Sequence, residues 1–378
     1  MYKRQIEKDI EEYLNSSKPK ILFIWGPRRS GKTTLLEKVA SDKKSRIFNF
    51  DYVTDREFFV NRREIVAKLV KENSLILIDE VQNYPESTVA LKILADNYDI
   101  KIIATGSSEL RKKSQNFDTL AGRFDEIFCL PLSVFELSEN DMPKDYELSQ
   151  YYKMKALEGM VFGFYPEVLT AKKEEDKVKL LEKILNTYVL KDAIDIYELK
   201  NAKLAKDILV KLALQIGQEV SFNEIARSLG ANVGTVSNYI EVFVKNYIIF
   251  PLPSYKTNLR RAVSEKGKYF FLDIGIRNAL VKDFREIDLR PDKGGVFENF
   301  VISEVYKKNL IDLRKVNMYF FRDYSGREVD LVLEDYKKNY SCLEIKFSDG
   351  SFNKNIFPLA HKGSVVNLEN YFTRIPRS

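Results

Sequence analysis

Residues 26–33 read Gly26-Pro27-Arg28-Arg29-Ser30-Gly31-Lys32-Thr33, which fits the pattern G-x-x-x-x-G-K-[ST]. The apolar run at 21–25 is typical of a strand buried on both faces of a parallel sheet, and residues 33–40 have the pattern of a helix. Glycines at both ends of the loop let backbone N–H groups converge on phosphate oxygens, and the helix N-terminus adds partial positive charge. The stretch therefore predicts a nucleoside triphosphate site.

Two neighbouring side chains at the end of this loop are expected to bind different groups, one the phosphates and the other a metal ion. Lys32 would reach the β and γ phosphates, and the Thr33 hydroxyl would bind Mg²⁺, so ATP and Mg²⁺ are the expected cofactors. The predicted nucleotide-binding residues are Gly26, Pro27, Arg28, Arg29, Ser30, Gly31, Lys32, Thr33, Thr34 and Ser107.

A second apolar run, at 75–78, ends in the carboxylates Asp79 and Glu80. A carboxylate at the end of a buried strand can hold Mg²⁺, and the next one can orient and polarise the attacking water. Asp79 is therefore predicted as a metal residue and Glu80 as a catalytic residue. This pair indicates hydrolysis of the nucleotide rather than its storage.

Two further polar residues follow a third predicted strand at 100–104. Ser107 is predicted to sense the γ-phosphate, although it would serve equally well as the N-cap of a helix beginning near Glu109. Arg123 is predicted to act as an arginine finger across subunits or as a clamp on phosphate, with an ordinary surface salt bridge as the alternative.

The length of 378 residues predicts two to four domains in an α/β protein. Strands alternating with helices predict a P-loop ATPase core at 1–135, with parallel strands and helices on both faces of the sheet. From 136 to 203 helical patterns replace strands, which predicts a helical lid over the nucleotide. Residues 204–285 and 286–378 are predicted as two more domains.

Composition excludes several classes of protein. The chain is 44% hydrophobic and 31% charged, and its apolar runs are far shorter than the roughly 20 residues needed to cross a bilayer. The N-terminus lacks a secretory pattern, and Cys129 and Cys342 lie in apolar segments, as core cysteines of a reducing compartment do. We therefore expect a cytoplasmic protein with no membrane partner. His361 is the only histidine and is predicted to be solvated, which disfavours histidine-dependent catalysis.

Three helical patterns and two strand patterns between 204 and 285 predict a winged helix. The second helix of the helix-turn-helix would begin at Val233, and strands at 247–250 and 269–272 would form the wing. The basic residues between these strands would follow a phosphate backbone. They are Lys256, Arg260, Arg261, Lys266 and Lys268. The sequence therefore predicts DNA as a partner, and the alternative is a protein-docking module with a solvated loop.

Charged residues at three places near the C-terminus predict a metal site. Asp330 lies in a predicted strand, Glu344 and Lys346 share one face of the next, and Glu298 lies on the apolar face of a helix. Glu298, Asp330 and Glu344 could bind Mg²⁺, with Lys346 as a catalytic residue beside the attacking water, a set that suits phosphodiester hydrolysis. The alternative is a charge network across neighbouring strands.

Over nearly its full length the sequence resembles a family of prokaryotic AAA-type ATPases with a winged helix and a C-terminal restriction-endonuclease-like domain. The resemblance rests on matched segments in all predicted regions. They are Gly26-Pro27-Arg28, Asp79-Glu80-Val81-Gln82, Thr105-Gly106-Ser107-Ser108, Leu120-Ala121-Gly122-Arg123, Pro131-Leu132-Ser133, Tyr165-Pro166-Glu167-Val168-Leu169, residues 269–275, Phe297-Glu298-Asn299 and the Asp330, Glu344, Lys346 set. The resemblance implies ATP binding and this domain order. Arg29 departs from the expected uncharged polar residue.

These patterns together predict Mg²⁺-dependent ATP hydrolysis coupled to DNA binding or remodelling, with a nuclease-like C-terminal domain. Assembly into a homo-oligomer is compatible with this function. The alternative is a nucleotide-switched regulator or adaptor that binds protein partners without cutting DNA. A small-molecule kinase is disfavoured because about 240 residues follow the predicted sheet.

Overall fold

The computed structural model describes residues 2–17, 21–106, 117–187, 201–256, 267–312 and 316–375. The chain forms two compact units. Lys3–Leu130 make up the first unit, and Pro131–Ser378, together with Met1–Tyr2, make up the second. Each unit is described by itself below.

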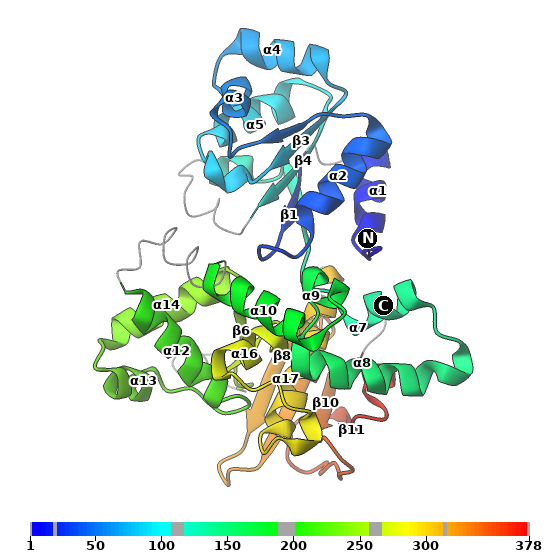
Figure 1. The fold of residues 1–378 in the computed structure, drawn as a ribbon, viewed down its shortest axis with the longest axis vertical. Helices are drawn as coiled ribbons and strands as arrows, with labels where there is room; N and C mark the ends of the chain where they lie inside the picture. Colours follow the sequence, from blue (N-terminus) through cyan, green and yellow to red (C-terminus); the bar gives the residue numbers. More distant parts are fainter. Residues whose placement is uncertain are drawn as a thin grey trace. The chain divides into compact units, whose positions relative to one another are not determined.

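A five-stranded sheet in the order β2-β3-β4-β1-β5 forms the centre of the first unit (Figure 1). All of its neighbouring strands are parallel. The strands are β1 (Ile21–Trp25), β2 (Ile47–Asn49), β3 (Leu75–Asp79), β4 (Lys101–Gly106) and β5 (Phe124–Phe128). The helices are α1 (Glu7–Asn15), α2 (Lys32–Lys43), α3 (Val53–Arg56), α4 (Arg63–Glu72) and α5 (Ser87–Asn97). The predicted α/β fold with a parallel sheet is confirmed for this unit.

Burial explains why β1 and β3 lack the polar alternation of a half-exposed strand. Every residue of both strands is buried, as in strands covered on both faces. β1 lies between β4 and β5, with Trp25 opposite Gly106 on one side and Phe128 on the other. The carboxyl ends of β1, β4 and β5 therefore meet where the predicted phosphate loop begins.

The second unit begins with helices that pack on its later elements. These helices are α7 (Val134–Asp141), α8 (Leu148–Phe162), α9 (Pro166–Thr170) and α10 (Glu174–Ile184). α8 contacts α16 (Ile274–Val281) and α17 (Lys293–Ile311), and α10 contacts α16. The regions predicted as three separate domains after residue 135 thus pack as one compact unit. The lid role of 136–203 stays a prediction.

Three helices and a hairpin follow, namely α12 (Ala202–Leu214), α13 (Phe222–Leu229), α14 (Val233–Lys245), β6 (Ile249–Leu252) and β7 (Lys268–Phe271). Ser221 caps α13 by accepting a hydrogen bond from the Glu224 backbone N–H at 3.4 Å. β6 and β7 pair antiparallel, as the predicted wing strands should. Arg260, Arg261 and Lys266 lie outside the described residues. The prediction that Lys268 belongs to a surface cluster is wrong, because its side chain is 1% exposed.

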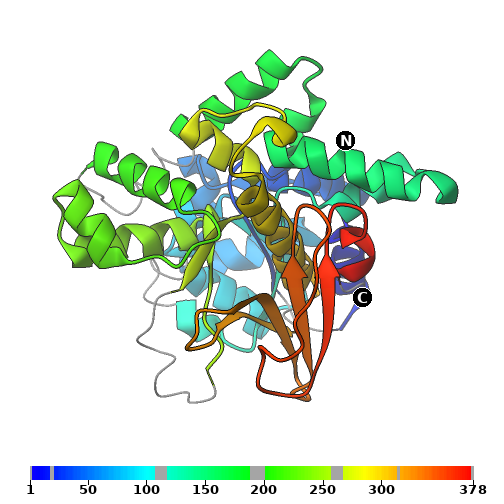
Figure 2. The same cartoon turned by 90° about the horizontal axis from the view of Figure 1, so that it is seen from below.

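A mixed sheet in the order β11-β10-β9-β8 ends the chain, and α17 packs against β10 (Figure 2). β8, β9 and β10 are antiparallel, whereas β10 and β11 are parallel. The predicted pairing of the strands that carry Asp330 and Glu344 is confirmed by the neighbours Leu331 and Leu343. The elements are β8 (Val316–Arg322), β9 (Glu328–Asp335), β10 (Tyr340–Ile345), β11 (His361–Val366) and α18 (Tyr371–Arg374).

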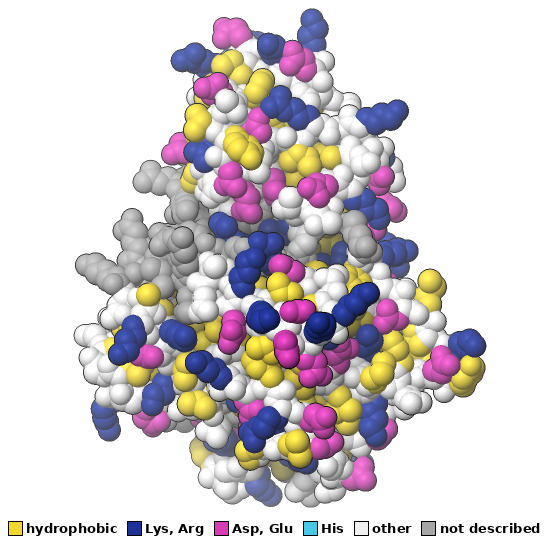
Figure 3. All heavy atoms as spheres, viewed as in Figure 1, with side chains coloured by type: hydrophobic (Ala, Val, Ile, Leu, Met, Phe, Trp, Pro, Cys, Tyr) yellow, Lys and Arg dark blue, Asp and Glu magenta, His cyan; other side chains and the backbone are white. Residues whose placement is uncertain are grey.

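The structure confirms the expectation that both cysteines lie in the core, whereas His361, predicted to be solvated, has a half-buried ring that packs against Phe352 and Phe357. Cys129 and Cys342 are buried free thiols. Within the part of the chain that the structure describes, no helix combines the length and apolar character needed to cross a membrane. On the face shown in Figure 3, lysine and arginine side chains are interspersed with aspartate and glutamate.

Candidate functional site

The phosphate loop follows β1 and is fitted closely to the chain after β5. A Cβ atom added to Gly26 would lie 1.9 Å from the carbonyl oxygen of Cys129, so no larger residue fits without moving backbone. Gly31 has φ of 101°, a conformation that favours glycine, and it precedes the first residue of α2. Both glycines are therefore required by the shape of the loop.

Lys32 turns back into this loop. Its ammonium donates to the carbonyl oxygens of Gly26 at 3.0 Å and Pro27 at 2.8 Å, and its side chain is 5% exposed. Burial lowers the pKa of Lys32, and the nearby Glu80 carboxylate opposes that change. The loop thus holds a buried cation on two neutral acceptors, which fits an anionic ligand such as phosphate.

The structure brings together the two residues predicted to hold Mg²⁺ beside the nucleotide. The Thr33 hydroxyl donates to Asp79 Oδ2 at 2.9 Å, and the hydroxyl of Thr105 donates to Asp79 Oδ1. Thr105, near the end of β4, belongs to the segment from which Ser107 and not Thr105 was predicted as the polar residue of this site. Its signal in the sequence was a hydroxyl residue directly after the predicted strand at 100–104.

Glu80 leaves β3 in an unusual backbone conformation. Its φ of 54° and ψ of 46° are left-handed, which is uncommon for a residue with a side chain. The Gln82 side-chain amide donates a hydrogen bond to Glu80 Oε2 and so fixes the carboxylate from the following turn. Strained backbone of this kind clusters at functional sites. The geometry fits a carboxylate that is held ready to orient a water molecule.

The remaining residues predicted to bind nucleotide differ in their burial. Ser30 is buried, and its hydroxyl donates to the Pro27 carbonyl at 2.9 Å. Arg28 is half-buried, while Arg29 and Thr34 are exposed, and Arg29 has φ of 65°. Ser107 lies outside the described residues, so its role stays a prediction.

Arg123 forms a surface ion pair. Its Nε atom lies 2.6 Å from Asp96 Oδ1, and the two side chains are 33% and 38% exposed. The surface salt bridge that was the alternative is thus present. The finger role across subunits stays a prediction.

Arg4 contacts the phosphate loop and was missed by sequence reasoning. Its guanidinium donates to the Ser30 carbonyl at 2.7 Å and the Leu130 carbonyl at 2.6 Å, and it also lies 3.4 Å from Cys129 Sγ. Its side chain is 6% exposed. Arg4 therefore braces the phosphate loop against the chain that leaves β5.

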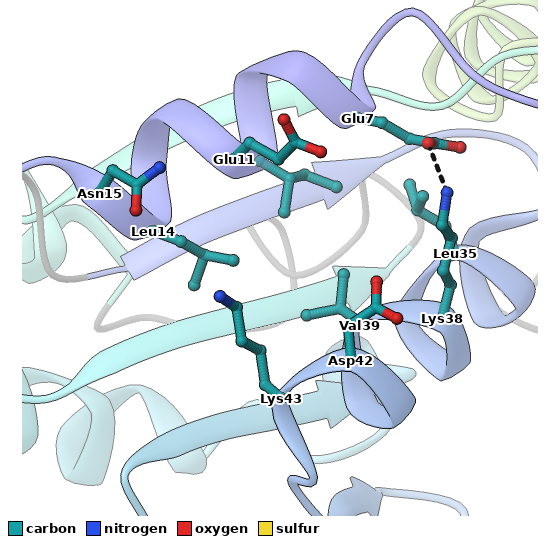
Figure 4. A pocket seen from close by; sticks show the side chains of 10 residues that line it. Glu7, Glu11, Leu14, Asn15, Leu35, Lys38, Val39, Asp42 and Lys43 are labelled. Carbon is teal, nitrogen blue, oxygen red and sulfur yellow. Dashed lines mark hydrogen bonds and ion pairs between the residues drawn. The ribbon is translucent and has the colours of Figure 1, made fainter.

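A pocket of about 310 Å³ lies between α1 and α2 in the same unit (Figure 4). Ile10, Leu14, Leu35 and Val39 supply its apolar wall, and Glu7 and Lys38 form an ion pair of 2.7 Å at one end. Its lining comes from the two helices rather than from the phosphate loop. We therefore separate this pocket from the nucleotide site.

A second candidate site lies in the second unit, where the predicted metal and lysine residues converge. Lys346 Nζ is 2.8 Å from Glu344 Oε1 and 3.8 Å from Asp330 Oδ2. The Ile345 backbone N–H donates to Asp330 Oδ2 at 2.7 Å. Burial, with a contribution from the Glu344 carboxylate, raises the pKa of Asp330 to about 6. The structure thus brings these three residues together.

Glu298 is connected to this site by Glu328 and Lys268, two residues that the sequence analysis did not assign to it. Single oxygens of Glu298, Glu328 and Asp330 all lie within 4.8 Å of one another. Lys268 forms ion pairs with Glu298 at 2.9 Å and with Glu328. Burial raises the pKa of Glu298, and the Lys268 ammonium opposes that rise. The sequence could have assigned Glu328 to this site, because it precedes Asp330 by two residues and so shares its face of the strand. Nothing in the sequence assigns Lys268 to the site.

Family models cover most of the chain in three parts. Residues 18–138 match the model described as AAA domain. Most of the matched residues belong to the first unit. This match supports a P-loop ATPase family and fits the site built from Lys32, Thr33 and Asp79. Residues 155–287 and 293–362 match two models, each described as a domain of unknown function (DUF8612 and DUF4143).

Two curated relatives match this chain over most of its length and over most of their own. The uncharacterized protein MJ1544 of Methanocaldococcus jannaschii is 24% identical, over 96% of this chain and 82% of its own. An uncharacterized protein of Haemophilus influenzae is 24% identical, over 83% of this chain and 81% of its own. The Walker-type ATPase paby2304 of Pyrococcus abyssi has a TM-score of 0.47 at 16% identity, covering 74% of this chain and 96% of its own.

We expect the Arg4→Ala variant to weaken Mg-ATP binding to the first unit roughly tenfold. A hydrogen bond from a charged donor contributes about 1.5–3 kcal/mol, and part of that energy fixes the loop that must receive phosphate. The measurement is ATP affinity by calorimetry beside the melting temperature, with Arg4→Lys as the conservative variant and the exposed Arg62→Ala as control. A lower melting temperature with unchanged ATP affinity would show that Arg4 has only a structural role.

Proposed function

We propose that the first unit binds and hydrolyses ATP in the presence of Mg²⁺. The observation that carries the proposal is the joint placement of Lys32 inside the phosphate loop and of the Thr33 hydroxyl on Asp79. A buried ammonium beside a helix N-terminus attracts anionic phosphate, and a hydroxyl with a carboxylate suits Mg²⁺. The match of residues 18–138 to an AAA domain supports the same function.

Each residue of this site has a separate task in the proposed reaction. Lys32 exchanges its two loop carbonyls for phosphate oxygens and neutralises their charge. Thr33 and Asp79 would hold Mg²⁺, which would supply positive charge beside the phosphate oxygens. Glu80, fixed by Gln82, orients the attacking water and accepts its proton.

The Glu80→Gln variant tests this division of tasks. Because an amide cannot accept the proton, we expect the hydrolysis rate to fall about 10²–10⁴-fold while Mg-ATP still binds. Phosphate release and ATP affinity are measured in parallel. The exposed Glu86→Gln variant, from the same unit, is the control and should behave as wild type. Undiminished turnover in Glu80→Gln would remove Glu80 from the mechanism.

A second proposed function is metal-dependent cleavage of DNA by the second unit. The observation in its favour is that Asp330 on β9, Glu344 on β10 and Lys346 after β10 lie close together in space. Two carboxylates that share a site repel one another, and a divalent cation relieves that repulsion. The residues thus fit Mg²⁺, which would activate water for attack on a phosphodiester.

Lys346 acts as a cation in this proposal. Burial opposes its charge, but the carboxylates of Glu344, Asp330 and Glu298 raise the pKa of Lys346 above its ordinary value. A lysine that stays protonated cannot take a proton from water. Its task is therefore to stabilise the negative charge that develops on the phosphate.

We infer a link between the two activities from their presence in one chain. The helices α12 to α14 with the hairpin β6–β7 have the element order of a winged helix, which supports DNA as the partner of 204–285. ATP hydrolysis would then control how the second unit engages DNA. A nucleotide-switched adaptor without cleavage is the alternative, favoured if ATP turns over but DNA stays intact with both Mg²⁺ and Mn²⁺.

A further inference from the structure

Lys268 lies among the acidic residues of the second unit. Its ammonium is 2.9 Å from Glu298 Oε1 and also pairs with Glu328 Oε1, although its side chain is 1% exposed. The three residues come from β7, α17 and β9. A buried ammonium is stable only when carboxylates compensate the loss of its hydration. The fold therefore places Lys268 here at a cost that the two glutamates offset.

The second oxygen of Glu328 is also taken by a protein cation. Arg322 donates from Nε to Glu328 Oε2 at 2.8 Å, and Arg322 also pairs with Glu219 at 2.9 Å. Glu328 thus has one basic side chain on each of its carboxylate oxygens. A metal ion at Glu328 would therefore share an oxygen with a basic side chain, whose positive charge repels it.

The other half of the cluster has a different character. Asp330 and Glu344 share Lys346, whose side chain is 47% exposed. The distance from Lys346 Nζ to Asp330 Oδ2 is 3.8 Å, longer than a hydrogen bond. Lys346 thus reaches solvent, whereas Lys268 does not, and its contact with Asp330 is looser than the ion pairs of Lys268.

We propose that Lys268 is a resident cation that takes the position of a second metal ion, which leaves room for one divalent ion, at Asp330 and Glu344. The inference rests on the proposed nuclease function. In this proposal Glu298, which the sequence predicts as a metal ligand, is a partner of Lys268 instead. Lys268 is a positioning residue that holds α17 and β9 at a fixed spacing. The hairpin β6–β7 thereby becomes part of the site.

The test counts Mn²⁺ bound per chain by electron paramagnetic resonance without nucleotide, in wild type, Lys268→Met and Lys268→Arg. An ion bound to the first unit contributes equally to all three counts, so it does not affect the differences between them. We expect Lys268→Met to bind one more ion than wild type and Lys268→Arg to bind no more. The exposed Lys362→Met variant, on β11 of the same unit, is the matched control. An unchanged count in Lys268→Met, or a gain in Lys268→Arg equal to that in Lys268→Met, overturns the proposal.

Folding of the variant is part of the test. If Lys268→Met unfolds, we expect millimolar Mn²⁺ to restore its melting transition, since the ion replaces the lost charge, and failure to restore it overturns the proposal. The proposed nuclease centre is judged separately, by whether Glu344→Gln removes one ion from the wild-type count. The loss of an ion in Glu344→Gln thus tests the proposed function, and the gain in Lys268→Met tests the role of Lys268.

Discussion

The Lys32→Ala variant is expected to lose affinity for Mg-ATP by roughly 10²–10⁴-fold. Lys32 now donates two hydrogen bonds to loop carbonyls, at 3.0 and 2.8 Å, and we expect these to pass to phosphate oxygens. Hydrogen bonds from a charged donor contribute about 1.5–3 kcal/mol each, and about 1.4 kcal/mol corresponds to a factor of ten. The measurement is ATP affinity by calorimetry, with ATP turnover measured beside it.

The free protein should respond differently to the same substitution. Burial lowers the pKa of Lys32, which shows that its charge is poorly solvated in the loop. Removing that charge should leave the melting temperature without ATP unchanged or higher, while the increase on adding Mg-ATP disappears. Lys43→Ala, an exposed lysine on the same helix, is the control. Wild-type ATP affinity in Lys32→Ala would contradict the site.

The nucleotide site could be predicted because its main residues are close together in sequence. The strand at 21–25, the loop and the helix that begins at Lys32 form one continuous segment, so its pattern determines local structure. Asp79 could be added because the ends of parallel strands meet at one edge of a sheet. Arg4 could not, since its partners are 26 and 126 residues away along the chain.

The second site was predicted in part for a related reason. Asp330 lies on β9, Glu344 lies on β10 and Lys346 directly follows β10. A short connection joins the two strands, and alternation along each strand pattern in the sequence predicts which faces these residues share. Lys268 belongs to a hairpin that precedes α17, and nothing in its own sequence distinguishes a buried lysine from one on a basic surface loop. Only the packing of β7 against α17 reveals its position.

The Lys346→Ala variant is expected to lose Mg²⁺- or Mn²⁺-dependent DNA cleavage by about 10²–10³-fold, the usual effect of removing one group that stabilises transition-state charge. Lys346 suits this role because its ammonium is 2.8 Å from Glu344 Oε1 while its side chain remains 47% exposed. The assay uses supercoiled, linear and single-stranded DNA with each metal. ATP turnover is measured in the same samples and should not change, because Lys346 and Lys32 belong to different compact units.

The matched control for this variant is Lys362→Ala, because Lys362 is an exposed lysine on β11, the strand parallel to β10. A general loss of positive charge would weaken cleavage in both variants, whereas a specific role affects Lys346→Ala alone. Lys346→Arg keeps the charge and should retain part of the activity. If wild type cuts none of the DNA forms with either metal, Asp330, Glu344 and Lys346 form a charge network between strands. ATP binding would then switch an adaptor rather than a nuclease.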